Sequence, residues 1–160
     1  MKVLGVDPGL TGTGFAMLEA QKGEIKLRIH GILRSSEMGW ENRVLDLANR
    51  VGELARQEEL EGIFCELPAY WGTFKQQMWA AQGSLVKQAV LVGAVLAQPG
   101  CKVVLVPVND WKGQMNKEIV EARVQECLGE KQSRSLRSHA VDACGIALWG
   151  LKHLGITTGW

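Results

Sequence analysis

This chain of 160 residues has neither a long apolar run nor a significant net charge. Its most apolar stretch, 85–97, contains Lys87 and falls short of the roughly 20 residues that a membrane-spanning helix needs. The apolar run that follows Met1 ends at Asp7, too early for a secretory signal peptide. We therefore expect a soluble cytoplasmic protein with no membrane partner.

The balance of charge gives no global field that would attract nucleic acid. Lys and Arg together number 18 and Asp and Glu 17, so the formal net charge is +1. Any contact with a polyanion must then come from a local basic patch, and the charge count by itself argues mildly against such a partner.

Cysteines are few and are not spaced as metal or disulfide motifs. The 4 cysteines (Cys65, Cys101, Cys127 and Cys144) lie far apart and form no C-x-x-C pair. This spacing disfavours zinc sites and disulfide frameworks. We expect buried thiols in a reducing compartment.

A dinucleotide-binding fingerprint is missing as well. The segment 9–14 reads Gly-Leu-Thr-Gly-Thr-Gly, which is not G-x-G-x-x-G, and it leads into a predicted strand instead of a helix. We expect no organic cofactor. A tight hairpin whose backbone passes close to a phosphate stays an open alternative for this segment.

The hydrophobic pattern predicts one α/β domain spanning residues 1–160, with 46% hydrophobic residues to form its core. The expected strands are 2–7, 14–20, 25–30, 62–67 and 102–108. The expected helices are 40–57 (capped by Ser35 or Ser36), 74–97, 115–128 and 138–153 (capped by Ser138). This order implies a mixed five-stranded sheet, an antiparallel meander beside parallel strands, flanked by helices.

Acidic residues stand at the ends of two of these predicted strands. Asp7 closes the first strand and Glu66 closes the fourth, and the carboxyl ends of parallel strands meet at one edge of a sheet. His139 and Asp142 lie three residues apart at the start of the last helix, so they share a helical face. We expect these four side chains to converge on one site.

Such a cluster needs a cation, because its carboxylates repel one another. Carboxylates suit Mg²⁺, for which Mn²⁺ substitutes, and two such ions can hydrolyse a phosphodiester. Each residue also has an ordinary interpretation: Asp7 as a turn residue, His139 as a helix start and Asp142 as a complement to the helix dipole. Glu66 is harder to explain in this way, since an acid that ends a buried strand needs a partner.

Basic and aromatic side chains provide candidate DNA contacts. Exposed aromatics beside a Lys suit stacking on unpaired bases, as in Tyr70, Trp71 and Lys75. Two further basic groups are candidates for contact with the DNA backbone: Lys112 with Lys117, and Lys131 with Arg134 and Arg137. A solvated loop is the usual interpretation of the second group.

The predicted helix 74–97 is too apolar to be covered by one sheet. Much of its second half is apolar on all sides. One sheet face covers a single stripe of a helix, so we expect the remainder to pack against a twin subunit.

Three motifs of this chain resemble those of RuvC-type Holliday-junction resolvases, which are RNase H-like nucleases. Val3-Leu-Gly-Val-Asp7-Pro-Gly-Leu-Thr-Gly-Thr-Gly-Phe is similar to the opening strand of that family. Phe64-Cys-Glu66 resembles its second acidic motif, and His139-Ala-Val-Asp142-Ala resembles its closing motif. The order and spacing of the three motifs agree over nearly the whole chain.

The resemblance implies an RNase H-like fold and a homodimer that nicks two strands of a four-way DNA junction symmetrically. It implies metal-binding catalytic roles for Asp7, Glu66, His139 and Asp142, and a basic residue near the scissile phosphate at Lys117. Lys112 matches another basic position. Tyr70 or Trp71 lies near the aromatic residue that the family inserts at the junction centre, although here Pro68-Ala69-Tyr70-Trp71 shifts the aromatic. Such an enzyme would work in the cytoplasm of a bacterium or a phage-infected cell.

Two other classes of function remain open from the sequence. An actin-like small-molecule kinase or ATPase shares the first motif, but those folds duplicate this sheet and need a second half to enclose adenosine. A non-catalytic module that binds branched DNA is the other alternative. A nucleotide-dependent thermal shift would favour the first, and junction binding without cleavage the second.

Overall fold

The computed structural model describes residues 1–68, 83–100 and 102–160. The segment 69–82 and Cys101 lie outside the described residues, and so do the proposed contacts Tyr70, Trp71 and Lys75.

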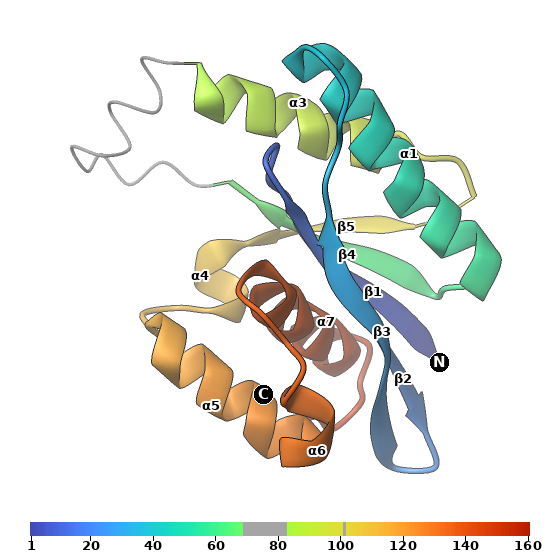
Figure 1. The fold of residues 1–160 in the computed structure, drawn as a ribbon. Helices are drawn as coiled ribbons and strands as arrows, with labels where there is room; N and C mark the ends of the chain where they lie inside the picture. Colours follow the sequence, from blue (N-terminus) through green and yellow to red (C-terminus); the bar gives the residue numbers. More distant parts are fainter. Residues whose placement is uncertain (69–82, 101) are drawn as a thin grey trace.

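A mixed five-stranded sheet forms the centre of the molecule, as the sequence predicts (Figure 1). Its strands are β1 (Lys2–Asp7), β2 (Thr13–Gln21), β3 (Glu24–Leu33), β4 (Gly62–Leu67) and β5 (Val103–Pro107). The strand order is β3-β2-β1-β4-β5. β1 pairs antiparallel with β2, and β2 with β3, whereas β4 runs parallel to both β1 and β5.

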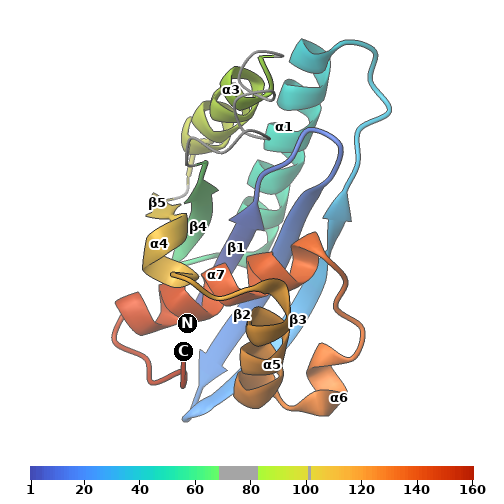
Figure 2. The same ribbon diagram turned by 90° about the vertical axis from the view of Figure 1, so that its left-hand side faces the viewer.

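Helices cover both faces of this sheet (Figures 1 and 2). One face carries α1 (Trp40–Glu58) and α3 (Ser84–Leu96). The other carries α4 (Val108–Trp111), α5 (Lys117–Leu128), α6 (Glu130–Ser133) and α7 (His139–His153). No helix in the described ranges is both long and apolar enough to cross a membrane.

The alternation of side chains along β1 assigns each residue to one of two cores. Leu4 and Val6 pack with the α1 side, whereas Val3 packs with the α7 side. Gly5 also faces α7, since a Cβ added to it would overlap the carbonyl oxygen of Ala143. Because successive residues of a strand point to opposite faces, Asp7 belongs to the α7 side.

The same alternation applies to β4. Ile63 and Cys65 are in the core under α1, and Phe64 is in the core under α7. Glu66, two residues after Phe64, therefore shares the α7 face with Asp7. The register of the parallel pair, which aligns Val6 with Cys65, sets the two acids side by side at the strand ends.

Glycines let the first turn of α7 approach this edge of the sheet. A Cβ added to Gly14, which pairs with Asp7 across β1 and β2, would overlap the backbone carbonyl of His139. Without a side chain at this position, His139 can come next to the end of β1.

The first helix begins at residue 40, as predicted, but its predicted serine cap was wrong, and the next predicted helix is not continuous. α1 begins after Gly39, whose positive φ of 83° sets the chain direction, so neither Ser35 nor Ser36 is its cap. α3 begins at Ser84 after Gly83, which has φ 70°, so the predicted helix 74–97 does not run continuously through Gly83, and 74–82 lie outside the described residues.

The C-terminal half also differs from prediction in detail. α5 begins at Lys117, capped by Asn116, whose side chain accepts a hydrogen bond from the Ile119 amide at 2.9 Å. The side chain of Ser138 does not cap α7, although Ser138 occupies the position just before it. α4 and α6 were not predicted, and one thiol expected to be buried, Cys127, is partly exposed.

Candidate functional site

Asp7 forms the centre of the acidic site at the carboxyl edge of the sheet. It is 8% exposed, which is low for an aspartate. Its Oδ2 lies 2.6 Å from Nδ1 of His139, in the first turn of α7. This hydrogen bond is the main reason that the pKa of His139 is raised, with burial acting in the opposite direction.

Glu66 is the second acid of the site and is largely shielded from water. Burial first, and the charge of Asp7 second, raise its pKa to about 7. A hydrogen bond from Nε1 of Trp111 to Oε2 of Glu66, at 3.0 Å, acts in the opposite direction because it stabilises the carboxylate. Glu66 therefore gains or loses its proton near neutral pH unless a cation joins it.

Asp142 completes the acidic group from the next turn of α7. Nζ of Lys112 lies 3.4 Å from its Oδ1, and this ammonium lowers the pKa of Asp142. Burial has the larger effect and the charge of Asp7 adds to it, so the net shift of this pKa is upward. In the structure Asp7 contacts His139, and the charge of Asp7 acts on both Glu66 and Asp142, so the four side chains lie at one edge of the sheet.

The donor atoms of this group suit a hard divalent cation. Carboxylate oxygens are the preferred ligands of such ions, and the charge of Asp7 raises the pKa of both Glu66 and Asp142. A bound cation would remove that mutual repulsion. In the described part of the chain, however, no three acidic, His or Cys side chains stand close enough to form a ready metal cluster. Instead, Trp111 hydrogen-bonds to Glu66 and Lys112 pairs with Asp142.

Lys112, and not Lys117, is the basic residue in contact with the acids. The Lys117 ammonium lies 3.7 Å from Oε1 of Glu121, one turn further along α5, and its side chain is 61% exposed. The structure therefore does not place Lys117 against the acidic group.

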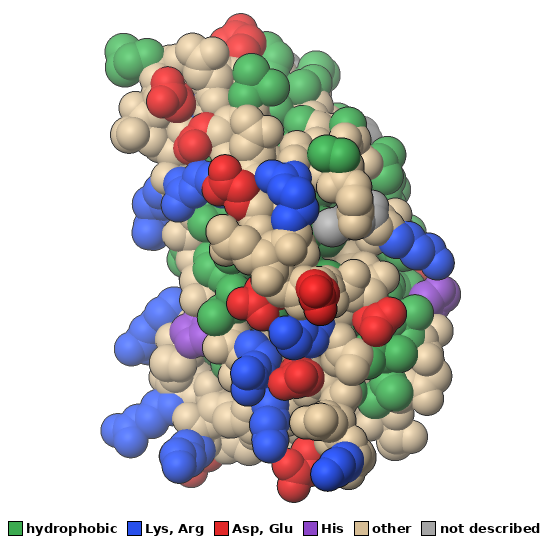
Figure 3. Space-filling view, turned by 90° about the vertical axis from the view of Figure 1, so that its right-hand side faces the viewer, with side chains coloured by type: hydrophobic (Ala, Val, Ile, Leu, Met, Phe, Trp, Pro, Cys, Tyr) green, Lys and Arg blue, Asp and Glu red, His purple; other side chains and the backbone are tan. Residues whose placement is uncertain are grey.

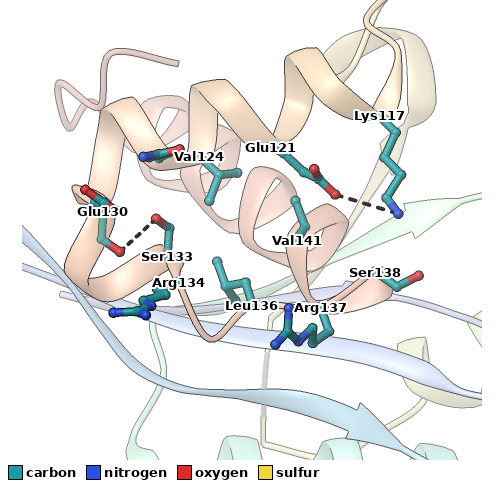
Figure 4. A pocket seen from close by; sticks show the side chains of 11 residues that line it. Lys117, Glu121, Val124, Glu130, Ser133, Arg134, Leu136, Arg137, Ser138 and Val141 are labelled. Carbon is teal, nitrogen blue, oxygen red and sulfur yellow. Dashed lines mark hydrogen bonds and ion pairs between the residues drawn. The ribbon is translucent and has the colours of Figure 1, made fainter.

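Two of the other predicted basic contacts, Arg134 and Arg137, line a pocket at the start of α7 (Figure 4). The pocket has a volume of about 430 Å³ and is lined from α5, α6 and the start of α7. Val124, Leu136 and Val141 provide apolar lining, and Arg134 and Arg137 line it together with Lys117. Lys131 is exposed on α6 and does not line the pocket.

Trp111 is a site residue that the sequence analysis missed. It is 2% exposed, and its backbone carbonyl accepts a hydrogen bond from Nε1 of Trp160 at 2.8 Å. α4 is only four residues long, so no periodic pattern indicates it. One signal in the sequence could have indicated Trp111. The segment that contains it directly follows β5, and β5 ends at the same edge of the sheet as β1 and β4.

Charge on the surface is mixed, in keeping with the net charge of +1. Figure 3 shows one face of the molecule, on which Lys and Arg side chains lie among Asp and Glu. A polyanion must therefore be attracted by local groups of cations. Lys117, Arg134 and Arg137 around the pocket in Figure 4 form such a group.

Comparisons with known proteins show which family this chain resembles. The sequence model of a family described as "Crossover junction endodeoxyribonuclease RuvC" matches residues 3–149. A protein of that name from Cupriavidus metallidurans is 32% identical over 92% of this chain and 82% of its own length. One from Synechocystis sp. is 28% identical over 92% of this chain and 89% of its own length.

Solved structures give the same result for the fold. Thermus thermophilus RuvC aligns with a TM-score of 0.75 at 24% identity, covering 99% of both chains. The structure described as "T. thermophilus RuvC in complex with Holliday junction substrate" aligns with a TM-score of 0.77 at 25% identity, covering 99% of this chain and 98% of that one.

Fold and site together define an α/β protein of the RNase H-like class with an acidic centre at the sheet edge. The match over nearly the whole chain is more specific. This chain belongs to the RuvC family of crossover junction endodeoxyribonucleases. Nucleases of this family depend in general on divalent metal ions.

Proposed function

We propose that this chain is a structure-selective endonuclease that resolves four-way DNA junctions in recombination and repair. The proposal is supported by the match to the RuvC family and by the position of Asp7, which contacts His139 and acts electrostatically on Glu66 and Asp142. A relative of the same fold has been solved with a Holliday junction as its substrate.

The proposed cofactor is Mg²⁺, two ions per site, with Mn²⁺ as a substitute. Asp7, Glu66 and Asp142 would hold the ions, with His139 as a further ligand or a neighbour that handles a proton. Bound there, such ions activate the attacking water and stabilise the leaving 3′ oxygen.

The residues of the chain have separable tasks in this reaction. Burial of Asp7 and Glu66 excludes competing water and strengthens their interaction with cations. The bond from His139 to Asp7 fixes the imidazole orientation, and the ring is placed to hold a proton at its other nitrogen. Lys112, released from Asp142, would pair with the DNA phosphate. The products would carry a 5′-phosphate and a 3′-hydroxyl.

Lys117, Lys131, Arg134 and Arg137 are proposed DNA-backbone contacts. Lys117, Arg134 and Arg137 line one pocket. Ser138, which directly precedes His139 in the chain, lines the same pocket. Cations in this position would guide a phosphate backbone toward the acids without reading its sequence. Tyr70, Trp71 and Lys75 stay predictions.

A homodimer is proposed because symmetric cutting needs two copies of the site. α3 carries an exposed apolar stripe at helical spacing on the side opposite its buried residues Leu91, Val92 and Val95. Its members are Val86, Ala89, Val90, Gly93, Leu96 and Ala97. Small residues at 89, 93 and 97 would let two helices approach closely.

Neither alternative function gains support from the comparisons. The whole-chain family match names a nuclease, which favours neither a kinase half nor a DNA-binding module without catalysis. The proposed place of action is the cytoplasm of a bacterium or a phage-infected cell, where such junctions arise.

One experiment tests the proposed function as a whole. The pure protein is incubated with end-labelled junction and with linear duplex of the same sequence, in Mg²⁺ and in chelator. Paired, symmetric nicks in the junction alone, dependent on the cation, are expected. Tight junction binding with no nicks in any divalent ion would favour the non-catalytic module.

A further inference from the structure

A second cavity opens at the same end of the molecule as the acidic site. It has a volume of about 420 Å³, enough for a nucleobase and its sugar. Three segments line it: the turn between β1 and β2, the start of α1 and the first turns of α3, which lie close together in Figures 1 and 2. Its lining residues are Gly9, Leu10, Thr11, Trp40, Arg43, Ser84, Lys87 and Gln88.

The chemistry of this lining matches that of a nucleotide. The indole of Trp40 is partly exposed, Arg43 and Lys87 also line the cavity, and no carboxylate is among the described lining residues. Nζ of Lys87 is 5.9 Å from the centroid of the Trp40 ring. The pocket beside α7 differs in this respect, since Glu121 and Glu130 line it together with its cations.

A direct contact connects this cavity to the catalytic edge. Nε2 of Gln88 donates a hydrogen bond to the carbonyl oxygen of Pro8 at 2.7 Å, and Pro8 directly follows Asp7. A strand of DNA held at the acids would therefore continue past the turn at Gly9 and reach the cavity.

The proposed dimer would leave this cavity accessible. Ser84, Lys87 and Gln88 lie on the side of α3 that bears the buried Leu91 and Val95, at i, i+3, i+4 and i+7 spacing. The exposed stripe that would face a second copy lies on the opposite side of the helix.

We propose that this cavity is a DNA subsite that takes a nucleotide unstacked near the point of strand exchange. Its base would stack on Trp40, and Arg43 and Lys87 would pair with the adjoining phosphates. Among the described residues, Lys87 makes a cation–π contact with Trp40 at 5.9 Å, and both side chains are partly exposed, so a base can displace the ammonium from the ring. The inference rests on the proposed function, since it assigns this surface to the same substrate.

The test measures affinity for a junction and for linear duplex at one salt concentration, with chelator present to prevent cutting. Trp40→Ala and Lys87→Ala should each weaken junction binding about tenfold, the effect of losing a stacked base or its phosphate partner, with a smaller effect on duplex. Trp40→Phe keeps an aromatic face and should stay within about threefold of the parent. Lys26→Ala, which removes an exposed cation on β3, is the charge-matched control and should have little effect.

A base analogue identifies the contact directly. 2-Aminopurine is placed singly at nucleotides around the exchange point, and its fluorescence should change on binding at one of them. That response should be lost in Trp40→Ala and kept in Trp40→Phe, a difference that a general loss of stability would not produce. Thermal unfolding of each variant identifies any that is misfolded, and Lys87→Ala tests the subsite without altering the core.

The outcomes separate the subsite from the function on which it rests. If the parent prefers the junction while Trp40→Ala and Lys87→Ala bind it within twofold of the parent, the subsite is wrong and the function stands. If the parent shows no preference for a junction over duplex, the proposed function fails and the subsite fails with it.

Discussion

At the scale of single residues, the site depends on acids kept out of water next to one another. Asp7 and Glu66 occupy strand ends on the same sheet face, and Asp142 adds a third carboxylate. Ionised carboxylates in such a place are stable only with a compensating cation. In the structure, Lys112 and His139 partly provide this compensation.

Replacing Asp7 by Asn should separate cleavage from binding. Loss of even a partner of a metal ligand lowers activity about 10–100-fold, so losing the proposed central ligand should lower the rate more than 100-fold. Junction affinity should be kept or improved, because one negative charge near the phosphate is removed. Single-turnover cleavage and a binding titration measure the two effects.

The control for this change is Asp46→Asn on the surface of α1, where Asp46 pairs with Arg50 at 3.7 Å. This substitution also removes one negative charge, but at a position far from the site, so it should leave cleavage unchanged. Equal losses of binding and cleavage in Asp7→Asn would contradict a catalytic role for Asp7.

Glu66 should make the metal-free protein less stable as pH rises. Its pKa is about 7 in the folded protein and roughly 4.3 in an unfolded chain. Between these values folding takes up a proton, so the contribution of Glu66 to stability is full below the lower pKa and is lost as pH rises through the higher one. The difference is on the order of 3 kcal/mol.

Glu66→Gln removes this dependence. In chelator, unfolding free energies of the parent and the variant should diverge between about pH 4 and pH 7, with the parent losing more. Millimolar Mg²⁺ should recover the loss in the parent above pH 7 and have little effect on the variant. If the unfolding free energies of the parent and the variant change with pH in parallel, both in chelator and in Mg²⁺, Glu66 is not the group responsible for the pH dependence.

At the scale of elements, the close approach of α7 to the sheet places His139 beside Asp7. Gly14→Ala adds a Cβ that overlaps the His139 carbonyl, a backbone group that cannot move without shifting the helix. We expect a loss of about 1–3 kcal/mol in unfolding free energy. Cleavage should fall further than junction binding, because His139 and Asp142 move together away from Asp7.

Gly62→Ala is the matched control, since Gly62 begins β4 in the same sheet. A Cβ there meets the Lys102 carbonyl oxygen at 3.4 Å, an ordinary contact. It should change stability and cleavage little. If the two substitutions have equal effects on stability and cleavage, the close approach of α7 to the sheet does not depend on the missing side chain at Gly14.

The elements that carry the four proposed site residues could be predicted from the sequence because each has a strong local pattern. β1 and β4 are short apolar runs that end in an acid, and α7 is a long apolar helix with His139 and Asp142 three apart. These patterns, with the rule that ligands gather at carboxyl ends of parallel strands, suffice to bring the four side chains together.

What could not be predicted depends on short or irregular backbone. α4 and α6 are each four residues long, so they have no periodicity, yet α4 brings Trp111 to Glu66 and sets Lys112 beside Asp142. The start of α1 depends on the positive φ of Gly39 and not on a serine cap. The cavity at Trp40 arises from three segments that no sequence motif connects.

At the scale of the whole molecule, the proposed dimer depends on one helix face. Val90→Glu places a charge in the middle of the exposed stripe of α3, where Val90 is 43% exposed in the single chain. The fold of each copy should be unaffected, because the side chain is outside the core. Sedimentation equilibrium should show a dimer for the parent and a monomer for the variant, which should also lose paired nicking.

Leu45→Glu is the control for this change. Leu45 is 58% exposed on α1, so the same kind of charge enters an apolar position away from α3. This variant should remain dimeric. A dimer that survives Val90→Glu, or a parent that sediments as a monomer, would contradict the α3 interface.

The most direct measurement of the central claim uses Fe²⁺ in place of Mg²⁺, with ascorbate and peroxide to generate hydroxyl radicals at the bound ion. Radicals formed there break the polypeptide only nearby, and mass spectrometry locates the breaks. We predict breaks next to residues 7, 66 and 139–142 together, suppressed by excess Mg²⁺ and absent in Asp7→Asn. Breaks confined to one of these segments, or unaffected by Mg²⁺, would contradict a single metal site built from all three.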